Sequence, residues 1–430
     1  MSRPATLRPN PEVPVFAPVV LLLCVLAVST PGALRLATGV PVWLEATRAL
    51  GLASLVLWAL SLVLMLRLRS LEEALGGLDR LYYLHHLCGG LAYLALLAHP
   101  LPLFLASAPG HWLPSSGWAV AAGWVAMLAM MAMMLATFLM SLGYARWKQV
   151  HAVSAPAFVL AGVHALALAP AALSLDSVLA GLALLVGCAC LAIRYMMEAG
   201  RLRSLPYRVE RVAHPAADIT EVVLSPDRLM VRPRPGQFVF VAFFDGRNFH
   251  GCGEFHPFTV VSSEPGSGRF TLLVKALGDC TAHLRDLEAG TRARVEGPYG
   301  SFLATIDPAR PQLWIAGGIG ITPFVSAAAA RPPAAESVDL FYLVSSPQEA
   351  VGLERLQELA GSGRHLKLHC FTGEDDFAHI WQKIREQLPD LRARQVFMCG
   401  PPALVDGLRL ALTEAGVAQS EIHSERFDFR

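Results

Sequence analysis

The chain has 430 residues, of which 54% are hydrophobic, and its 35 lysines and arginines nearly balance 34 aspartates and glutamates. This charge balance argues against nucleic acid as a partner, and the eight scattered cysteines, with no Cys-x-x-Cys pair, support neither an iron–sulfur cluster nor a zinc ribbon. Residues 1–200 hold only 17 of the 69 charged residues, so an apolar membrane half precedes a soluble half.

Six apolar stretches are each long enough, at about 1.5 Å of rise per residue, to cross roughly 30 Å of hydrocarbon. The first includes Val15–Val28 and lacks a convincing small-residue cleavage site, so we expect a retained helix rather than a secretory signal. The predicted spans cover residues 14–34, 42–66, 81–106, 117–142, 151–170 and 174–197.

The basic residues of the membrane half predict its orientation. With a cytoplasmic N-terminus, only Arg35 and Arg48 fall outside, whereas the other eight fall inside. We therefore expect a multi-pass protein of the inner (plasma) membrane with both termini in the cytoplasm. The residues expected inside are Arg3, Arg8, Arg67, Arg69, Arg80, Arg146, Lys148 and Arg194.

The sequence pattern of the soluble half differs between its first and second parts. After Arg203, short β-rich runs broken by proline and glycine predict a small antiparallel β-barrel. From Gln312, apolar strands alternate with helices, as in a parallel α/β nucleotide-binding domain. The fold class is thus a multi-domain membrane protein: a six-helix transmembrane bundle (residues 1–203), an antiparallel β-barrel (204–305) and an α/β nucleotide-binding domain (306–430).

Five of the fourteen histidines lie in the third and fifth spans, although a histidine inside a membrane is energetically costly. Because these spans run in the same direction, His85 and His151 share the inner level, and His99 and His164 the outer level. Separations of 14 and 13 residues correspond to about 20 Å of rise, which leaves room for two stacked haems, each held by one imidazole from each helix.

Helix geometry tests this hypothesis. His85 and His99 are 14 residues apart, a step that returns to within about 40° of the same helix face, and this favours His85 over His86. His151 and His164 are 13 residues apart, a step that places them about 140° apart around a regular helix. A bulge or bend between His151 and His164 is therefore required. The alternative roles are helix capping, core hydrogen bonding and proton relay, and we expect the blander roles for His86 and for His111, a loop residue.

The strand His256–Ser263 carries small hydroxyls and backbone donors, which the edge of an isoalloxazine ring and a pyrophosphate both need. Such a strand is ordinary by itself, but Pro235–Phe238, Gly278–Thr281 and Gly297–Gly300 lie near it in sequence and could shape a flavin groove. The candidate flavin-binding residues are His256, Pro257, Phe258, Thr259, Val260, Ser262, Ser263, Gly278 and Thr281.

The apolar strand Leu313–Ala316 runs into a glycine turn and a helix start, where backbone N–H groups can bind a pyrophosphate. The turn lacks the G-x-G-x-x-G spacing, so an ordinary tight turn remains the alternative. Thr322 is the expected N-cap and Pro323 the first helical residue.

A later strand ends at Cys399, where the backbone could border a nicotinamide, or the cysteine could simply be buried. The candidates are Gly317, Gly318, Gly320, Thr322, Pro323, Cys399, Gly400 and Pro401.

Together these motifs resemble the ferric reductase and NADPH oxidase superfamily, especially its single-chain bacterial members, over nearly the whole chain. The resemblance implies FAD at His256–Thr259, a nicotinamide at the two glycine segments, and Thr259, Cys399 and Phe427 as catalytic residues. Phe427 would cover the flavin until the nicotinamide displaces it, with Phe429 as the second candidate; the sequence alone favours simple packing. The implied ligands of two haems b are His85, His99, His151 and His164.

The expected electron order is NAD(P)H, FAD, inner haem, outer haem and an extracytoplasmic acceptor, because FAD converts a two-electron hydride into single electrons. Ser345 and Ser346 offer neither an arginine for a 2′-phosphate nor an acid for a ribose, so NADPH is only favoured and NADH stays possible. Oxygen, giving superoxide, and a ferric chelate both fit as the small-molecule acceptor. The alternative is an electron-delivering membrane subunit for a dedicated extracytoplasmic partner protein.

Overall fold

The structure is a computed structural model. The predicted span 14–34, His111, Phe427 and Phe429 lie outside the residues that it describes. By their contacts, the described residues up to Leu71 form one compact unit with Arg80–Tyr195, while Glu72–Asp79 and the described residues from Met196 onward form a second. The described residues are 39–107, 117–140, 142, 144–171, 173–246, 249–332, 335–362, 365–373 and 377–425.

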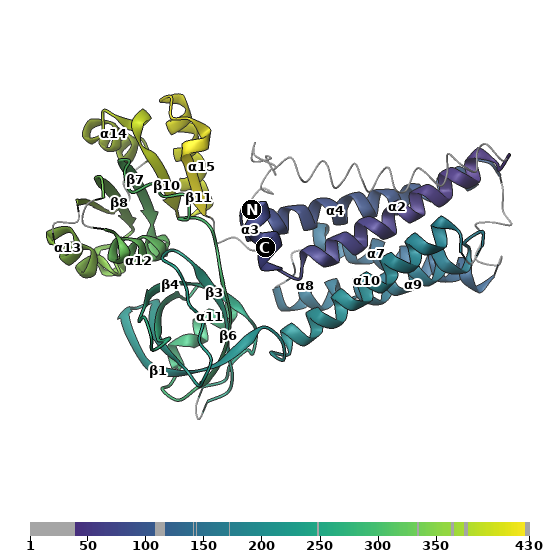
Figure 1. The fold of residues 1–430 in the computed structure, drawn as a ribbon, viewed down its shortest axis with the longest axis horizontal. Helices are drawn as coiled ribbons and strands as arrows, with labels where there is room; N and C mark the ends of the chain where they lie inside the picture. Colours follow the sequence, from purple (N-terminus) through teal and green to yellow (C-terminus); the bar gives the residue numbers. More distant parts are fainter. Residues whose placement is uncertain are drawn as a thin grey trace. The chain divides into compact units, whose positions relative to one another are not determined.

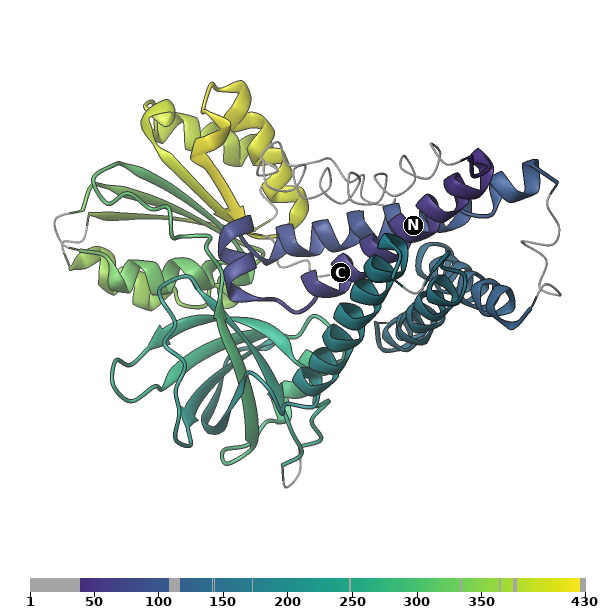
Figure 2. The ribbon, with the colours of Figure 1, turned by 45° about the vertical axis from the view of Figure 1, so that its right-hand side comes forward.

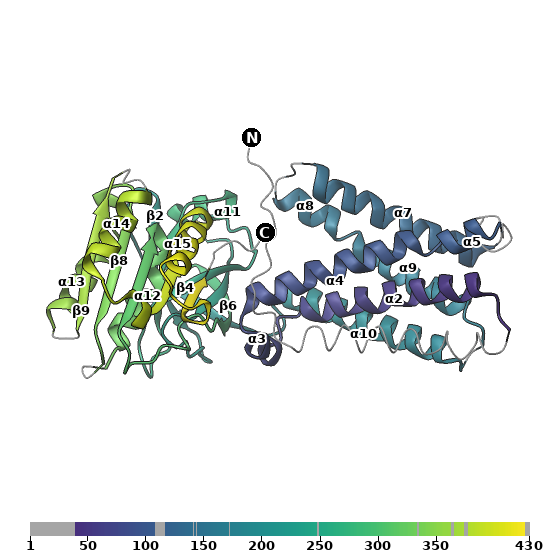
Figure 3. The ribbon, with the colours of Figure 1, turned by 90° about the horizontal axis from the view of Figure 1, so that it is seen from above.

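The first unit is a bundle of long apolar helices that run side by side (Figures 1 and 3). Within the described residues, five helices are long and apolar enough to cross a membrane. They confirm five of the six predicted spans. The remaining span, residues 14–34, lies outside the described residues. The helices are α2 (Val42–Leu64), α3 (Arg69–Leu75), α4 (Leu78–Ala98) followed by α5 (Leu101–Leu105), α7 (Trp118–Leu139), α8 (Tyr144–His151) followed by α9 (Ser154–Ala167), and α10 (Leu175–Glu198).

Both histidine-bearing spans are interrupted. The third span breaks at His99–Pro100, between α4 and α5, and the fifth breaks at Ala152–Val153, between α8 and α9. The fifth span also begins earlier than predicted, at Arg146, so His151 lies inside it rather than at its first residue.

The second interruption has a proline as its cause. Pro156 has no N–H to donate to the carbonyl of Ala152, four residues earlier, and this carbonyl accepts from the N–H of Ala155 at 3.1 Å instead. The resulting tight turn changes the rotation of the chain between His151 and His164. It is a local bend of the kind that their 13-residue spacing required.

The bundle core packs aromatic rings against a helix surface that lacks a side chain. Trp58 on α2 and Phe158 on α9 meet edge to face, with ring centres 5.6 Å apart. Phe158 is fully buried and lies directly against Gly187 on α10, where a Cβ atom would overlap the ring. Glycine at this position therefore lets α9 and α10 approach closely.

We predict that Gly187→Ala destabilises the bundle by about 1–3 kcal/mol, because the buried Phe158 ring must move to admit a methyl group. Gly181→Ala on the same helix is the matched control, since its nearest neighbour is a Leu166 methyl 3.9 Å from the new Cβ. It should be neutral or stabilising by up to about 1 kcal/mol. Thermal unfolding of the detergent-purified variants measures both, and equal effects would contradict the prediction.

The second unit begins with a closed six-stranded barrel of antiparallel strands in the order β1-β2-β5-β4-β3-β6 (Figures 1 and 2). Its interior is filled by alternating apolar side chains such as Val222, Val241, Leu272 and Val295, which are all fully buried. The strands are β1 (Ser204–Ala216), β2 (Ile219–Pro226), β3 (Phe238–Phe243), β4 (His256–Ser263), β5 (Phe270–Lys275) and β6 (Arg292–Tyr299), with the short helix α11 (Asp279–His283) between β5 and β6.

A five-stranded parallel sheet follows, in the order β11-β10-β7-β8-β9, with helices on both faces. Helices α12 and α13 share one apolar cluster with the sheet, and α14 and α15 share another. The strands are β7 (Gln312–Gly317), β8 (Val338–Val344), β9 (Leu366–Thr372), β10 (Gln395–Cys399) and β11 (Ile422–Glu425), and the helices are α12 (Thr322–Ala330), α13 (Leu353–Gly361), α14 (Phe377–Gln387) and α15 (Pro402–Glu414).

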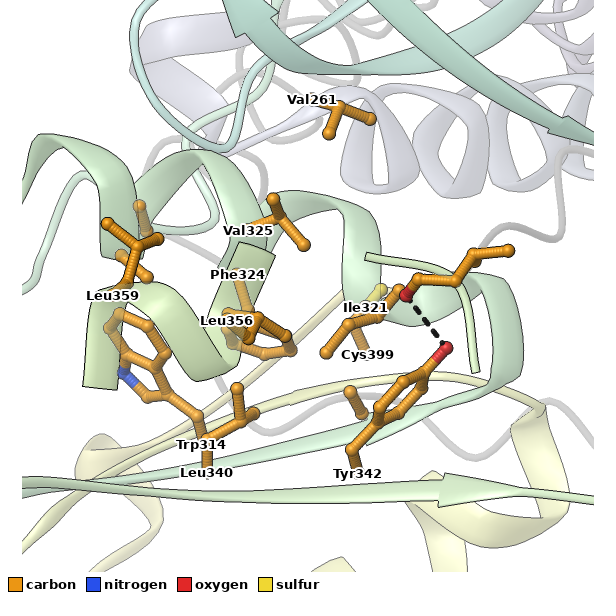
Figure 4. Close-up of a cluster of buried hydrophobic side chains, with 14 of the residues drawn as sticks. Val261, Trp314, Ile321, Phe324, Val325, Leu340, Tyr342, Leu356, Leu359 and Cys399 are labelled. Carbon is orange, nitrogen blue, oxygen red and sulfur yellow. Dashed lines mark hydrogen bonds between the residues drawn. The ribbon is translucent and has the colours of Figure 1, made fainter. Parts of the chain in front are cut away.

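Barrel and sheet share one hydrophobic core within the second unit. Val261 from β4 belongs to the same buried cluster as Phe324 and Val325 of α12 and Trp314 of β7 (Figure 4). The Ser326 hydroxyl of α12 also accepts a hydrogen bond from a backbone N–H of the barrel, that of Gly236, at 2.8 Å. Helix α12 therefore fixes the strand with the flavin motif against the strand with the glycine turn.

Candidate functional site

Four membrane histidines lie in two close pairs. The ring centres of His85 and His151 are 6.3 Å apart, and those of His99 and His164 are 6.0 Å apart, with interplanar angles of 70° and 90°. Two imidazoles on opposite sides of one metal ion, each at a metal–nitrogen distance of about 2 Å, have ring centres roughly 6 Å apart. His86 is exposed, unlike its neighbour His85.

Backbone carbonyls on neighbouring helices hold three of these rings. The Nδ1 atoms of His85 and His99 lie 3.1 Å and 2.7 Å from the carbonyl oxygens of Ser61 and Thr47 on α2. The Nδ1 of His164 lies 2.8 Å from a carbonyl of α7, that of Ala119. A carbonyl can only accept, so each Nδ1 carries the proton and each Nε2 keeps a free lone pair, the tautomer that a metal needs.

The fourth ring is held differently. The Nδ1 of His151 is buried and has no hydrogen-bond partner among the described residues. The imidazole stacks on Trp147, one helical turn earlier, with ring centres 5.0 Å apart and an interplanar angle of 19°. With three oriented Nε2 atoms and an unpartnered fourth imidazole, the donor set fits two six-coordinate haem irons.

Two glycines that sequence reasoning missed make room for the outer pair. A Cβ on Gly51 of α2 would lie 2.8 Å from the Nδ1 of His99, and one on Gly123 of α7 would lie 2.6 Å from the Cε1 of His164. These glycines allow both rings to reach the backbone carbonyls that orient them. In the sequence they are single glycines inside apolar runs, which is too common a pattern to single them out.

The flavin motif places one buried hydroxyl without a partner. Thr259 is 5% exposed, and its Oγ1 has no hydrogen-bond partner among the described residues. It lies opposite Phe238 of β3, close to the end of the barrel that carries Tyr299. Since an orphaned buried hydroxyl is costly, a ligand that bonds to it would be favoured. This donor fits the edge of a flavin ring.

The remaining residues of the motif divide by exposure. Thr281 is engaged in its own helix: its hydroxyl accepts from the N–H groups of Leu277 and Gly278, at 3.1 and 3.0 Å, and so fixes the turn before α11. The rest lie along β4: Phe258 and Val260 are buried, His256 and Pro257 are half-buried, and Ser262 and Ser263 are exposed.

The two predicted nicotinamide segments meet at the carboxyl ends of adjacent strands, β7 and β10. A Cβ on Gly320 would overlap the backbone carbonyl of Cys399, and one on Gly400 would lie 3.1 Å from the Cα of Gly317. Likewise, a Cβ on Gly317 would lie 2.8 Å from the Cδ of Pro401. Only glycines permit this close backbone contact, which is why the two segments carry them.

The start of helix α12 corrects one prediction. The turn Gly318–Ile321 is a 3₁₀ helix, so Thr322 already has helical dihedrals (φ −55°, ψ −45°) and the helix begins there. Thr322 was expected as the N-cap, but Ile321 holds that position and Pro323 is the second helical residue. The Thr322 hydroxyl donates to the carbonyl of Ile319 at 3.1 Å. Gly318 has φ +54° and open space around it.

A buried carboxyl that sequence reasoning passed over lies beside Cys399. Glu425 is directly opposite Cys399 in the parallel ladder of β10 and β11, and it is 6% exposed. Burial and then the nearby carboxyls of Asp79 and Glu72 raise the pKa of Glu425 to about 8. Burial and Glu425 raise the pKa of the Cys399 thiol well above its ordinary value, so both groups are neutral at pH 7.

Comparison with known proteins identifies the domains. The chain matches "Ferric reductase like transmembrane component" over residues 50–162, "FAD-binding domain" over residues 205–302 and "Oxidoreductase NAD-binding domain" over residues 314–409. Together with the fold, these matches define a multi-pass membrane oxidoreductase that uses FAD and a nicotinamide nucleotide. Their order matches the architecture of the ferric reductase and NADPH oxidase superfamily.

Individual relatives are more distant. The chain is 28% identical over 208 residues to the glycine betaine monooxygenase reductase subunit of Pseudomonas aeruginosa (strain UCBPP-PA14), covering 45% of this chain and 56% of that protein. It is 30% identical over 182 residues to NADH-cytochrome b5 reductase 1 of Aspergillus clavatus, covering 38% and 59%. The chain thus spans little more than half the length of these curated relatives.

Among solved structures, a flavohemoglobin from Malassezia yamatoensis with bound FAD and heme is 20% identical, with coverage of 93% of this chain and 100% of that chain and a TM-score of 0.49. The Amycolatopsis cytochrome P450 reductase GcoB is 26% identical, with coverage of 52% and 70% and a TM-score of 0.45.

The Glu425 carboxyl predicts a pH dependence of stability. Its pKa is about 8 in the folded chain against an ordinary value of 4.5, so folding takes up a proton between these pH values. Stability should therefore fall as pH rises from about 4.5 to about 8. Glu425→Gln, which cannot ionise, should remove this part of the slope.

Thermal unfolding midpoints of parent and variant at about pH 6 and about pH 8 measure the difference. The matched control is Glu358→Gln on α13, whose carboxylate is 66% exposed and should leave the slope unchanged. If Glu425→Gln kept the parent slope, the neutral buried carboxyl would be ruled out.

Proposed function

We propose that this protein passes electrons from cytoplasmic NAD(P)H through FAD and two bis-histidine haems to an acceptor on the other side of the inner (plasma) membrane. Both termini would lie in the cytoplasm. The proposed division is a haem domain over residues 1–203, an FAD domain over residues 204–305 and an NAD(P)H domain over residues 306–430. This agrees with the family matches to all three regions.

The observation that carries the proposal is the pairing of the four imidazoles. His85 with His151 and His99 with His164 each join the third and fifth spans, 14 and 13 residues apart along them. A proton relay or a helix cap would not require two pairs of similar ring separation, 6.3 Å and 6.0 Å, at two levels. Nor would it require three rings whose Nδ1 atoms are fixed by carbonyls, with each Nε2 left free.

When bound, FAD would accept a hydride and release its electrons singly, and each haem would carry one electron at a time. The protein's own part is to position these groups. The Thr259 hydroxyl would orient the flavin edge, while the backbone of Gly317–Gly320 would bind the dinucleotide pyrophosphate at the start of α12. Cys399–Pro401 would border the nicotinamide, and Phe427 would cover the flavin.

The ligand set also limits the acceptor. Two imidazoles per iron leave no open coordination position, so the acceptor would be reduced at the haem edge rather than bound to iron. Oxygen, giving superoxide, and a ferric chelate both meet this condition. For the nicotinamide, Ser345 and Ser346 follow β8 in place of a charged selector, so NADPH stays the first choice and NADH the second.

The first test is haem content in the full-length protein, purified in detergent and loaded with FAD. His99→Leu with His164→Leu should remove about half of the haem, because one of two sites is lost, and His85→Leu with His151→Leu should remove the other half. Anaerobic NADPH should reduce the parent's haem, as measured by its absorption bands. His86→Leu is the matched control and should keep the full haem content.

Several outcomes would overturn the proposal. These are a parent that binds no haem, a parent whose haem neither NADPH nor NADH reduces, or a His86→Leu variant that loses about half of its haem. Turnover with oxygen or ferric chelates by the purified protein supports an enzyme. Turnover only after a second protein is added favours the electron-delivering subunit.

The orphaned hydroxyl gives a second test. Thr259→Val keeps the shape of the side chain and removes one hydrogen-bonding group, so FAD should bind roughly three- to tenfold more weakly, since such a bond contributes about 1 kcal/mol. Because the hydroxyl lacks a partner in the described protein, the FAD-free variant should be as stable as the parent or more stable. Flavin fluorescence titration and thermal unfolding measure the two effects.

Thr291→Val is the matched control, because the buried Oγ1 of Thr291 also has no hydrogen-bond partner within the described part of the chain. It precedes β6 near Ala293, which lies opposite Phe243, whereas Thr259 lies opposite Phe238 at the other end of β3. Its FAD affinity should equal that of the parent. Equal weakening by both substitutions would exclude a specific role for Thr259.

A further inference from the structure

Three metal-ligating side chains meet on the barrel, and one of them, His256, is also the first residue of the flavin motif. The sulfur atoms of Cys252 and Cys280 and a ring nitrogen of His256 all lie within 4.8 Å of one another, and the Sγ of Cys252 is 3.6 Å from the Nε2 of His256. They come from the loop after β3, from helix α11 and from the first position of β4. Cys252 is exposed and the other two are half-buried, so an ion can reach them from solvent.

The described residues around Cys252 are tightly folded. Gly251 packs so closely on the carbonyl of Phe243 that a Cβ would overlap it, and its N–H donates to the Oδ1 of Asp245 at 3.1 Å. Gly253 has φ +64° and donates its N–H to the same carbonyl at 3.2 Å. Glycines on both sides thus fix the position of Cys252 before any ion binds.

The donor chemistry selects the class of ion. Two thiolates and one imidazole are the ligands that Zn²⁺ prefers, and ligands at about 2.0 to 2.3 Å in a tetrahedron lie roughly 3.5 to 3.8 Å apart. The sulfur–nitrogen distance of 3.6 Å already meets this requirement. Three protein ligands leave the fourth position to water, as in zinc sites with an open position.

We propose that Cys252, His256 and Cys280 form a binding site for a thiophilic divalent cation, with Zn²⁺ as the first candidate. The choice of an ion over a Cys252–Cys280 disulfide rests on the proposed orientation, because thiols that face the cytoplasm are kept reduced. Binding to the first residue of β4 ties this strand to α11 and to the loop after β3. The ion therefore stabilises the barrel.

The test uses the full-length, FAD-loaded protein, purified in detergent with Zn²⁺ and then dialysed. Mass spectrometry of the metal should find one zinc per chain in the parent, and X-ray absorption at the zinc edge should find two sulfur neighbours at about 2.3 Å. Cys252→Ser and Cys280→Ser should each lose the zinc, and with it the rise in thermal unfolding midpoint that added Zn²⁺ gives the parent. Cys370→Ser, which removes an exposed thiol on β9, is the matched control and should keep both.

The proposal is overturned if the dialysed parent holds no zinc, or if the Cys252→Ser and Cys280→Ser double variant retains it. It is also overturned if the freshly purified protein carries a Cys252–Cys280 disulfide. Reduction of haem by NADPH, measured on the same samples, keeps the two proposals apart: zinc content does not depend on it, and its failure alone would affect only the electron-transfer function.

Discussion

An imidazole within a membrane-spanning helix needs a polar partner, because the hydrocarbon around it offers none. Helix α2 provides such partners from its own backbone. The carbonyls of Thr47 and Ser61 accept hydrogen bonds from the Nδ1 atoms of His99 and His85. The two carbonyls are 14 residues apart, as the two histidines are. This match fixes α2 beside α4. It also leaves the Nε2 atoms of His85 and His99 available to bind a metal. The glycines that make room on α2 and α7 follow from the same requirement.

In the second unit, the corresponding constraint is the approach of backbone to backbone. Gly317, Gly320 and Gly400 allow the carboxyl ends of β7 and β10 to touch, and α12, which begins directly after them, packs on the strand that carries Thr259. The flavin strand and the dinucleotide turn are therefore positioned by one helix. Placing both on rigid elements suits a reaction in which a hydride must pass between two bound groups over a short distance.

Much of the fold could be predicted from the sequence, because mean hydropathy and the spacing of apolar residues indicate directly which side chains are buried. The apolar spans, the barrel and the parallel sheet all follow from such patterns, and the 13-residue spacing of His151 and His164 even indicated a bend. Other features have no sequence signature. A backbone carbonyl that accepts from a histidine is invisible, and the Thr322 position was wrong by one residue because a 3₁₀ turn lengthens the helix start. Cys252, His256 and Cys280 match no ligand spacing, and only the barrel brings them together.

The matched interval on α2 also bears on how such a protein can change during evolution. Inserting or deleting one residue between Thr47 and Ser61 would rotate one carbonyl by about 100° relative to the other, so only one of His85 and His99 could keep its partner. Most substitutions within the interval leave the carbonyls in place, except at Gly51, where a Cβ would lie 2.8 Å from the Nδ1 of His99. Descendants of this chain should therefore accumulate changes of residue there but not changes of length, and insertions should be confined to the connections between helices.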